Sequence, residues 1–127
     1  MNIIITRPLM DSEDLMRKFF SMGHKIIHLP TLKISPIKMN PIDGDEYDAF
    51  VFTSANAIRN LNLKNNNKNN LCFCVGSITE KIARQSGFVE TFSAGGTINA
   101  LKNLILDSDK INNKSKIGYI CGDNISY

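Results

Sequence analysis

The chain has 127 residues, of which 43% are hydrophobic and 21% are charged, and its formal net charge is +3. These values are typical of a folded protein of one ordinary domain, and they exclude wholesale disorder. This net charge is too small for a nucleic-acid-binding surface. No apolar run approaches the roughly 20 residues of a membrane helix, and the first residues lack the basic region of a signal peptide. We therefore expect a cytoplasmic protein that binds neither nucleic acid nor a membrane.

The start of the chain predicts one βαβ unit. Residues 2–6 form an apolar run with β-branched side chains, which is typical of a strand covered on both faces. Asp11 or Ser12 can cap a helix, and Gly23 can end it in a left-handed conformation. Residues 24–29 predict a second strand, parallel to the first. The apolar positions of the helix are Leu15, Met16, Phe19, Phe20 and Met22.

Residues 31–45 interrupt this pattern. The alternation of Leu32 and Ile34 with polar residues predicts an exposed strand. Proline cannot donate a backbone hydrogen bond, so the prolines of this region indicate a linker of limited flexibility. These prolines are Pro30, Pro36 and Pro41. We place a domain boundary near Ser35.

A second alternation of strands and helices follows the linker. Strands are predicted at residues 49–53, 71–75, 88–92 and 116–121, and helices at residues 55–61, 76–85 and 97–106. Thr97 can cap the last of these helices, Gly87 can end the one before it, and Gly95-Gly96 forms a turn. Residues 65–70, five of which are Asn, predict a solvated loop. The alternation indicates an α/β fold with parallel sheets.

Both sheets are expected to be incomplete in this chain. The first βαβ unit has only two strands, which are too few to bury a sheet. A parallel edge strand needs a helix over its face, yet no room follows the turn at Gly122-Asp123-Asn124. We therefore expect either partner strands from elsewhere or a longer protein.

The cysteines predict reduced, buried thiols rather than disulfides or a metal site. Cys72, Cys74 and Cys121 are odd in number and lie in apolar strands. Cys72 and Cys74 would point to the same side of a strand, at a spacing that a disulfide rarely tolerates. With only His24 and His28 elsewhere, the spacing of a zinc site is lacking. We expect the thiols to act as small apolar groups.

A polar turn follows the predicted buried strand at residues 49–53. In open α/β sheets, ligands bind at the carboxyl ends of strands, where helix N-termini point free amides. The turn Thr53-Ser54-Ala55-Asn56 is therefore a candidate binding site. The alternative role for Ser54 and Asn56 is helix capping, which these residue types favour and which is compatible with ligand binding.

Five blocks along the chain resemble uroporphyrinogen-III synthase, in the order in which that family has them. The blocks are Ile4-Ile5-Thr6-Arg7-Pro8, Gly23-His24 with Ile27-His28-Leu29-Pro30, Tyr47-Asp48-Ala49 with Phe52-Thr53-Ser54-Ala55-Asn56-Ala57, Cys74-Val75-Gly76-Ser77-Ile78-Thr79 with Gly87-Phe88, and Tyr119-Ile120-Cys121-Gly122-Asp123. No single block is decisive, but together they cover nearly the whole chain.

The resemblance implies a particular architecture. Members of this family fold as two flavodoxin-like α/β domains joined by a two-stranded β linker. On that plan, residues 1–34 are the first βαβ segment of domain 1, and residues 35–127 are domain 2 without its last helix and strand. The chain thus resembles the N-terminal half of the enzyme, and the complete protein is expected to be a monomer.

The resemblance also implies an activity. The family cyclises the linear tetrapyrrole hydroxymethylbilane to uroporphyrinogen III in heme biosynthesis, with loss of water and inversion of the last pyrrole ring through a spiro intermediate. No metal or organic cofactor takes part. The substrate is a flexible polycarboxylate, and hydroxyls and backbone amides at helix N-termini suit its carboxylates.

The candidate substrate-binding residues lie at strand ends, where an interdomain cleft is expected: they are Thr6, Arg7, Ser54, Asn56, Gly76 and Thr79. Each has a structural alternative. Arg7 can pair with a substrate carboxylate or be a surface charge, and Thr6 can be a turn hydroxyl. Thr79 corresponds to a threonine that lines the cleft in the family, and its structural alternative is a residue on the helix surface. Gly76 is expected to allow a close backbone approach at its strand end.

No catalytic side chain is assigned. The family's tyrosine near the return linker corresponds to a position beyond Tyr127, and Tyr127 itself is given no role. Tyr47 precedes a strand at the end opposite the expected cleft, which favours packing. Asp123 can cap a helix after the last strand.

Other functions of an α/β domain are alternatives. A phospho-receiver needs acidic residues at the end of its first strand, where this chain has Ile5-Thr6-Arg7. A flavin or nucleotide domain would have a phosphate-binding loop such as G-x-G-x-x-G, and none is present. A flavodoxin-like or receiver-like module that binds a small ligand or a protein stays open. So does a truncated, inactive remnant of the synthase.

Overall fold

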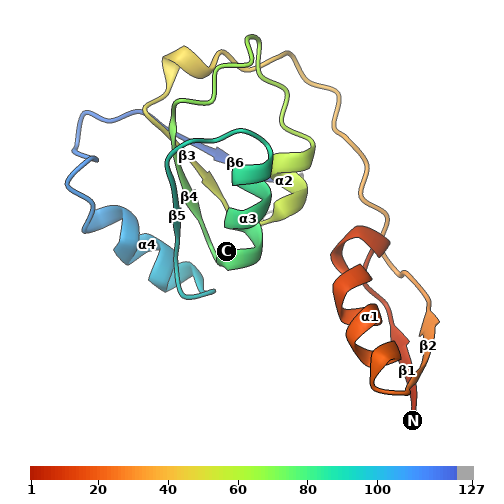
Figure 1. Cartoon of the computed structure of the whole chain (residues 1–127). Coiled ribbons are helices and arrows are strands. Elements are labelled where there is room, and N and C mark those ends of the chain that lie inside the picture. The colour runs from red at the N-terminus through yellow and green to blue at the C-terminus, as the bar shows by residue number, and fades with distance from the viewer. Residues whose placement is uncertain (123–127) are drawn as a thin grey trace. The chain divides into compact units, whose positions relative to one another are not determined.

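The computed structural model describes residues 1–122, and the chain divides into two compact units, Met1–Pro36 and Ile37–Tyr127. Each unit combines helices with a sheet whose paired strands are parallel, so the predicted α/β class is confirmed (Figure 1). Asp123, which was predicted to cap a helix, lies outside the described residues. Tyr127, for which no role was predicted, lies outside them as well.

The first unit is a single βαβ motif. Its elements are β1 (Asn2–Ile5), the 3₁₀ turn η1 (Leu9–Asp11), α1 (Glu13–Ser21) and β2 (Lys25–His28). The strands pair in parallel, with Ile3 opposite Ile26. Gly23, at φ +86°, ends α1 as predicted, because the left-handed backbone lets the amides of Gly23 and His24 bond to carbonyls of the last turn.

Only one face of the first unit's sheet is covered among the described residues. Ile5 is buried and Ile3 half-buried, whereas Ile4, on the opposite face, is 59% exposed. The predicted coverage of residues 2–6 on both faces is therefore wrong here, because the single helix α1 can pack on only one side of a two-stranded sheet.

Two further expectations for this region are corrected. Ser12 occupies the N-cap position of α1, but its buried hydroxyl donates to the carbonyl of Pro8 (3.0 Å) instead of accepting from the helix. The strand expected at Leu32 and Ile34 is absent, since residues 29–41 form no strand and are exposed throughout. Prolines without an amide proton and the lack of a pairing strand explain the open backbone.

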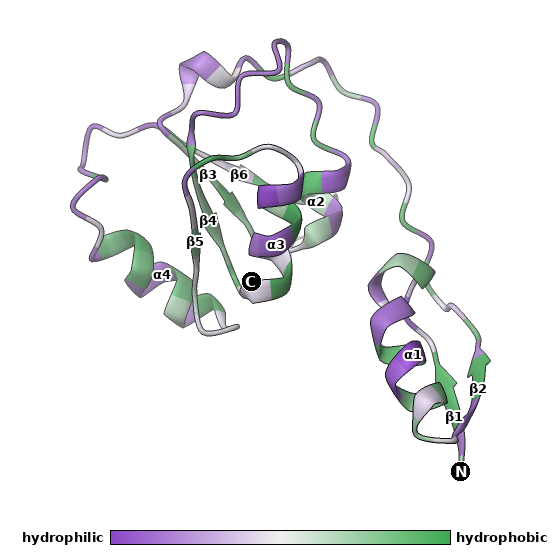
Figure 2. Ribbon diagram, viewed as in Figure 1, coloured by the Kyte–Doolittle hydropathy of each residue, from purple (hydrophilic) through white to green (hydrophobic). Residues whose placement is uncertain are grey.

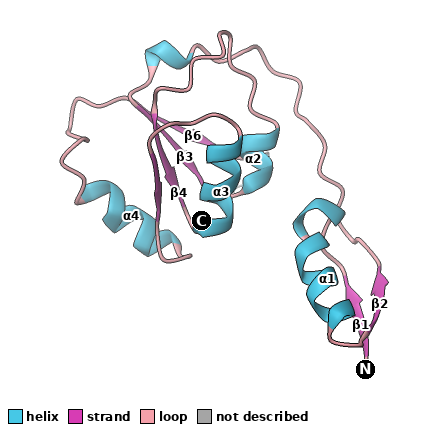
Figure 3. Cartoon of the chain, in the orientation of Figure 1, coloured by secondary structure: helices cyan, strands magenta, loops and turns pink. Residues whose placement is uncertain are grey.

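The second unit contains a four-stranded parallel sheet in the order β5-β4-β3-β6. Figure 3 shows its strands in magenta, with β3, β4 and β6 labelled. Its elements are η2 (Gly44–Glu46), β3 (Ala49–Phe52), α2 (Ala55–Arg59), β4 (Leu71–Cys74), α3 (Ser77–Gln85), β5 (Thr91–Ser93), α4 (Ile98–Leu106) and β6 (Ile117–Ile120). Thr97 caps α4 as predicted, its hydroxyl accepting from the amide of Ala100 at 3.1 Å. Residues 65–70 form a loop, also as predicted.

The sheet of the second unit is covered on both faces. Phe50, Phe52, Cys72 and Cys74 face α2 and α3, with Ile58, Ala83 and Phe88 in the same cluster. Ala49, Val51 and Phe73 face α4, where they meet Leu101. Because its two faces are both covered, β3 is buried along its whole length, and Figure 2 shows the apolar strands between the helices.

The strand predicted at residues 88–92 begins later than expected. Phe88 belongs to the turn that ends α3, where Gly87 has φ +106° and the Phe88 amide bonds to the Ala83 carbonyl (3.2 Å). This is a Schellman motif, in which an apolar residue after the glycine commonly packs back on the helix. Phe88 is apolar for that reason, and β5 begins only at Thr91.

The thiols of Cys72 and Cys74 are reduced and buried in the second unit, as predicted. Their Sγ atoms lie 3.7 Å apart on one face of β4. The hydrogen bond with Cys74, together with burial, raises the pKa of the Cys72 thiol above its ordinary value. The Cys72 thiol is therefore held in its protonated, unreactive form, whereas the same hydrogen bond lowers the pKa of the Cys74 thiol.

We expect a thiol reagent such as DTNB to label the partly exposed Cys121 first, and Cys72 and Cys74 only when the protein unfolds.

Because the folded-state pKa of Cys72 is raised, its contribution to stability is complete below the ordinary thiol pKa of 9.0 and is lost as the pH rises further. Urea unfolding between pH 7 and pH 10 measures this loss. The Cys72→Ala/Cys74→Ala variant serves as control and should show a flatter pH dependence; an identical slope would contradict the expectation.

Candidate functional site at the carboxyl edge of the sheet

The order of the strands in the second unit defines a switch point. The chain passes from β3 to β4 to β5 in one direction and then returns to place β6 on the other side of β3. In open α/β sheets, ligands bind outside the carboxyl ends of the strands where the order reverses. The carboxyl ends of β3 and β6 are therefore the natural place for a ligand in this unit.

Ser54 follows β3 directly and caps α2. Its backbone is extended, and its hydroxyl oxygen accepts from the amide of Asn56 at 3.2 Å. The predicted capping role is thereby confirmed. Because the cap uses the hydroxyl only as an acceptor, the O–H proton of this exposed side chain can still donate to a ligand.

Asn56 lies in the first turn of α2 and is half-buried. Its Oδ1 accepts from Nη1 of Arg59 at 3.0 Å, which holds a guanidinium group beside the polar turn. Arg59 was not among the predicted site residues. The signal for it in the sequence is the spacing of three positions from Asn56, which places both residues on one side of a helix.

Tyr119 is the second residue that sequence reasoning did not include in the site. It lies on β6 opposite Val51 of β3, and its hydroxyl is 3.3 Å from Oγ1 of Thr53. Tyr119 is 49% exposed. The sequence does not give the order of strands in a sheet, so it could not indicate that Tyr119 and Thr53, distant along the chain, lie side by side.

Gly76 and Thr79 follow β4, at the same edge of the sheet. Gly76 occupies the N-cap position of α3 with an extended backbone, and a Cβ there would lie 3.7 Å from Cα of Gly96. The backbone of Gly96 does approach Gly76 closely, as expected, although a Cβ at Gly76 would make only an ordinary van der Waals contact with it. Thr79 is only 6% exposed, so the alternative of a helix-surface threonine is wrong.

Thr6 and Arg7 follow β1 in the first unit, whereas the other four predicted site residues belong to the second. Both are exposed. Their backbone carbonyls receive hydrogen bonds from β2 and the segment after it: Thr31 donates its amide to Thr6 (2.9 Å), and Nε2 of His28 bonds to the Arg7 carbonyl (2.8 Å). These contacts fix the backbone of the turn that presents the two side chains.

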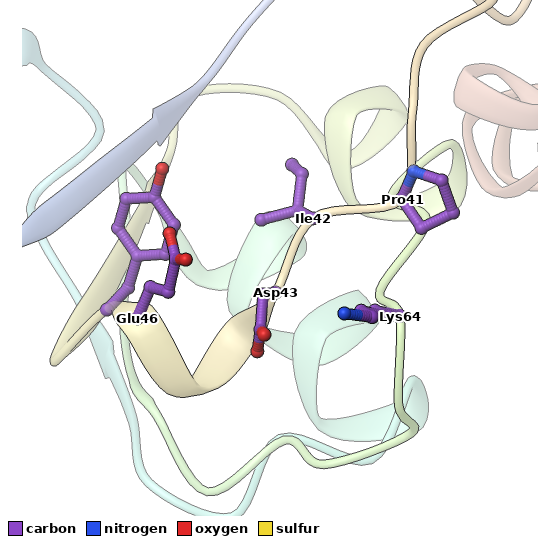
Figure 4. Close-up of a pocket in the computed structure, with 6 residues that line it drawn as sticks. Pro41, Ile42, Asp43, Glu46 and Lys64 are labelled. Carbon is purple, nitrogen blue, oxygen red and sulfur yellow. The ribbon is translucent and has the colours of Figure 1, made fainter.

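A pocket of about 450 Å³ lies at the opposite end of β3 (Figure 4). Its lining residues are Pro41, Ile42, Asp43, Glu46, Tyr47 and Lys64. None of them was predicted to bind substrate. Tyr47 packs against Phe50 with a ring-centroid separation of 5.4 Å, which confirms its predicted packing role. The pocket therefore contains none of the polar residues that follow the strands.

No group of three or more His, Cys, Asp or Glu side chains in residues 1–122 is arranged to hold a metal ion. Within the same residues, no helix is both long enough and apolar enough to cross a membrane.

The second unit is thus an open α/β domain covered by helices on both faces, with hydroxyl-bearing turns at its switch point. Comparison with protein families adds a specific match: the family model described as "Uroporphyrinogen-III synthase HemD" matches residues 13–127. The chain belongs to the uroporphyrinogen-III synthase family, and the predicted resemblance is confirmed. A search of curated proteins found no match to the chain.

Proposed function

We propose that this protein is a uroporphyrinogen-III synthase that converts hydroxymethylbilane into uroporphyrinogen III, as a step of heme biosynthesis. The reaction closes the linear tetrapyrrole, inverts its last pyrrole ring and releases one molecule of water, which makes the enzyme a lyase. The observation that carries the proposal is the family match, which extends over residues 13–127.

The reaction requires the protein chiefly to hold a flexible polycarboxylate in a nearly closed shape. Orienting the two ends of the substrate can remove a large part of the activation barrier to ring closure, because the substrate then loses its conformational freedom on binding and not in the chemical step. Ser54 offers a hydroxyl donor beside β3, and the free amides that begin α3 favour a negative charge. In the first unit, Arg7 offers a guanidinium, which pairs with carboxylates in a forked geometry.

The proposal includes the domain plan of the family. Residues 1–34 would be the first segment of one domain and residues 35–127 most of the other, with the protein acting as a cytoplasmic monomer on a small-molecule substrate. The binding roles of Thr6, Arg7, Ser54, Asn56, Gly76 and Thr79 belong to the same proposal.

The direct test is to incubate the purified protein with freshly prepared hydroxymethylbilane, oxidise the product and separate the porphyrin isomers. The type III isomer is expected. If only the type I isomer that forms spontaneously is found, this protein is not an active synthase, and the inactive-remnant alternative takes its place.

The Ser54→Ala variant tests the site within the same assay. Loss of a hydrogen bond to a carboxylate is expected to raise KM about tenfold. Thr97→Ala is the matched control, because Thr97 also caps a helix through its hydroxyl but follows β5 at the far edge of the sheet. Both variants lose a cap worth about 1 kcal/mol. Equal values of KM in the two variants would exclude Ser54 from substrate binding.

A further inference from the structure

Three consecutive backbone carbonyls in the turn after β1 accept hydrogen bonds. The first, that of Thr6, accepts from the amide of Thr31 at 2.9 Å. The third, that of Pro8, accepts from the buried hydroxyl of Ser12 at 3.0 Å. These two bonds join the turn to the segments that follow β2 and precede α1. The carbonyl between them, that of Arg7, has a donor of another kind.

The Arg7 carbonyl accepts from a side chain of β2. Nε2 of His28 lies 2.8 Å from this carbonyl oxygen. Because a carbonyl can only accept, Nε2 carries the ring proton, and in the neutral imidazole Nδ1 is then unprotonated. The contact therefore sets the tautomer of His28 as well as the position of the Arg7 backbone.

Packing alone would favour an apolar residue at the position of His28. The imidazole lies opposite Ile5 in the register of β1 and β2, on the face where Ile3 and Ile26 are also at least half-buried. A polar ring placed on such a face loses hydration, which a hydrogen bond must replace. The Arg7 carbonyl supplies that bond, so the imidazole serves the turn rather than the apolar packing.

The hydrogen bond restrains the residue that carries the charge of the turn. Pro8 disfavours a helical backbone at Arg7, the residue before it. The peptide group after Arg7 is held by His28, and the one before it is held by Thr31 through the Thr6 carbonyl. With both peptide groups held, the direction in which the Arg7 side chain leaves the backbone is set. A group directed before its ligand arrives loses less conformational freedom on binding.

We propose that His28 is a positioning residue for substrate binding: by holding the Arg7 carbonyl, its imidazole directs the Arg7 guanidinium toward a carboxylate of the tetrapyrrole. The inference rests on the proposed function, in which Arg7 pairs with such a carboxylate. A forked guanidinium–carboxylate pair depends on the orientation of both groups. A turn without the imidazole contact therefore binds the substrate more weakly, although the guanidinium itself is unchanged.

The test measures how tightly the whole protein binds uroporphyrin III, an octacarboxylate porphyrin, through quenching of its fluorescence. His28→Leu removes the donor and should raise the dissociation constant about fivefold. His28→Gln offers an amide Nε2–H donor in place of the imidazole one and should restore the constant to within about twofold of its original value. Equally weak binding by the Leu and Gln variants would exclude the hydrogen bond as the cause and overturn the inference.

The kinetic constants should follow the same order. We expect KM for hydroxymethylbilane to rise about fivefold in His28→Leu and to recover in His28→Gln, with kcat unchanged within about twofold, because the imidazole affects binding and not the chemical step. A fall in kcat with an unchanged KM would contradict a positioning role in binding.

A double-variant cycle shows whether His28 acts through Arg7. Arg7→Ala should raise the dissociation constant for uroporphyrin III about thirtyfold, as expected for loss of hydrogen bonds from a charged group. His28→Leu/Arg7→Ala should bind no more than about twofold more weakly than Arg7→Ala, because the imidazole then has no guanidinium to direct. Multiplication of the two single effects would mean that His28 acts independently of Arg7, and would overturn the inference.

His24→Leu is the matched control. His24 is half-buried like His28, but it precedes β2, and its ring packs against Phe19 with a centroid separation of 6.0 Å. The control should leave the dissociation constant unchanged within about twofold. An equal loss of binding in the two Leu variants would trace the effect to the fold of the first unit and not to the contact with Arg7, which contradicts the proposal.

The outcomes separate this inference from the proposed function. Unchanged uroporphyrin binding by His28→Leu overturns the inference, even when the unsubstituted protein forms the type III isomer. If the unsubstituted protein forms only the type I isomer, the proposed function fails, and the role of His28 is then judged on uroporphyrin binding alone. Absence of such binding by the unsubstituted protein overturns the inference as well.

Discussion

The Phe50→Ala variant is expected to lose about 3–5 kcal/mol of unfolding free energy, because it empties the centre of the larger core. Phe50 is completely buried, and its ring lies 6.2 Å from that of Phe52 and 6.3 Å from that of Phe88, measured between centroids. Small domains are stable by only about 5–15 kcal/mol, so the loss should be large enough to leave part of the protein unfolded. Urea denaturation followed by circular dichroism measures the change.

Phe20→Ala provides the comparison for Phe50. Phe20 is also a phenylalanine, but it lies on α1 of the first unit and is 75% exposed. Its replacement removes little packing, and we expect a change within about 0.5 kcal/mol. A similar loss for the two variants would contradict the packing described for the sheet face that meets α2 and α3.

The Gly118→Ala variant is expected to lose about 1–3 kcal/mol, since it adds a methyl group where the backbone of β6 meets the ring of Phe50. The added Cβ would lie 2.9 Å from Cδ1 of Phe50 and 3.2 Å from Cδ1 of Tyr47, so the strand or the rings must move. Urea denaturation measures the loss.

Gly122→Ala is the control for Gly118→Ala, because a Cβ at Gly122 meets no atom of the described residues 1–122 within 4 Å. It should leave stability unchanged. A second check is the Gly118→Ala/Phe50→Leu variant, in which the smaller side chain makes room for the methyl group. Its loss should be less than the sum of the two single losses, because the residues share one contact. Strict additivity would contradict a direct clash.

The elements of the second unit were predictable because their signals are local. Ala49–Phe52 is apolar at every position, as a strand buried on both faces must be, and it is buried throughout. Thr97 and Gly87 mark helix ends through side-chain capping and left-handed backbone, which depend only on neighbouring residues. Phe88 misled the prediction for the same reason: an apolar residue that packs on the end of α3 was taken for the start of a strand.

The candidate site was predictable only in part, because it depends on the order of strands. Ser54 and Asn56 follow a recognisable buried strand, so their place at its carboxyl end could be expected. Tyr119 could not be expected there, since β6 is the last of the described strands but lies next to the first strand of its sheet. Gly118 gives no local signal either, as its importance comes from the ring of Phe50.

The pairing of β3 with β6 also bears on how the protein is made. The two strands join residues 68 positions apart, as in the contact between Asp48 and Lys116. During synthesis, β3, β4 and β5 leave the ribosome before β6 is made. Until then, the backbone amides and carbonyls on the edge of β3 that pairs with β6 have no hydrogen-bond partner in the sheet. Such an open edge can pair with another chain, and pairing between distant segments is slow. The interval before β6 emerges is therefore when nascent chains of this protein are most exposed to aggregation, and when a chaperone has most to protect.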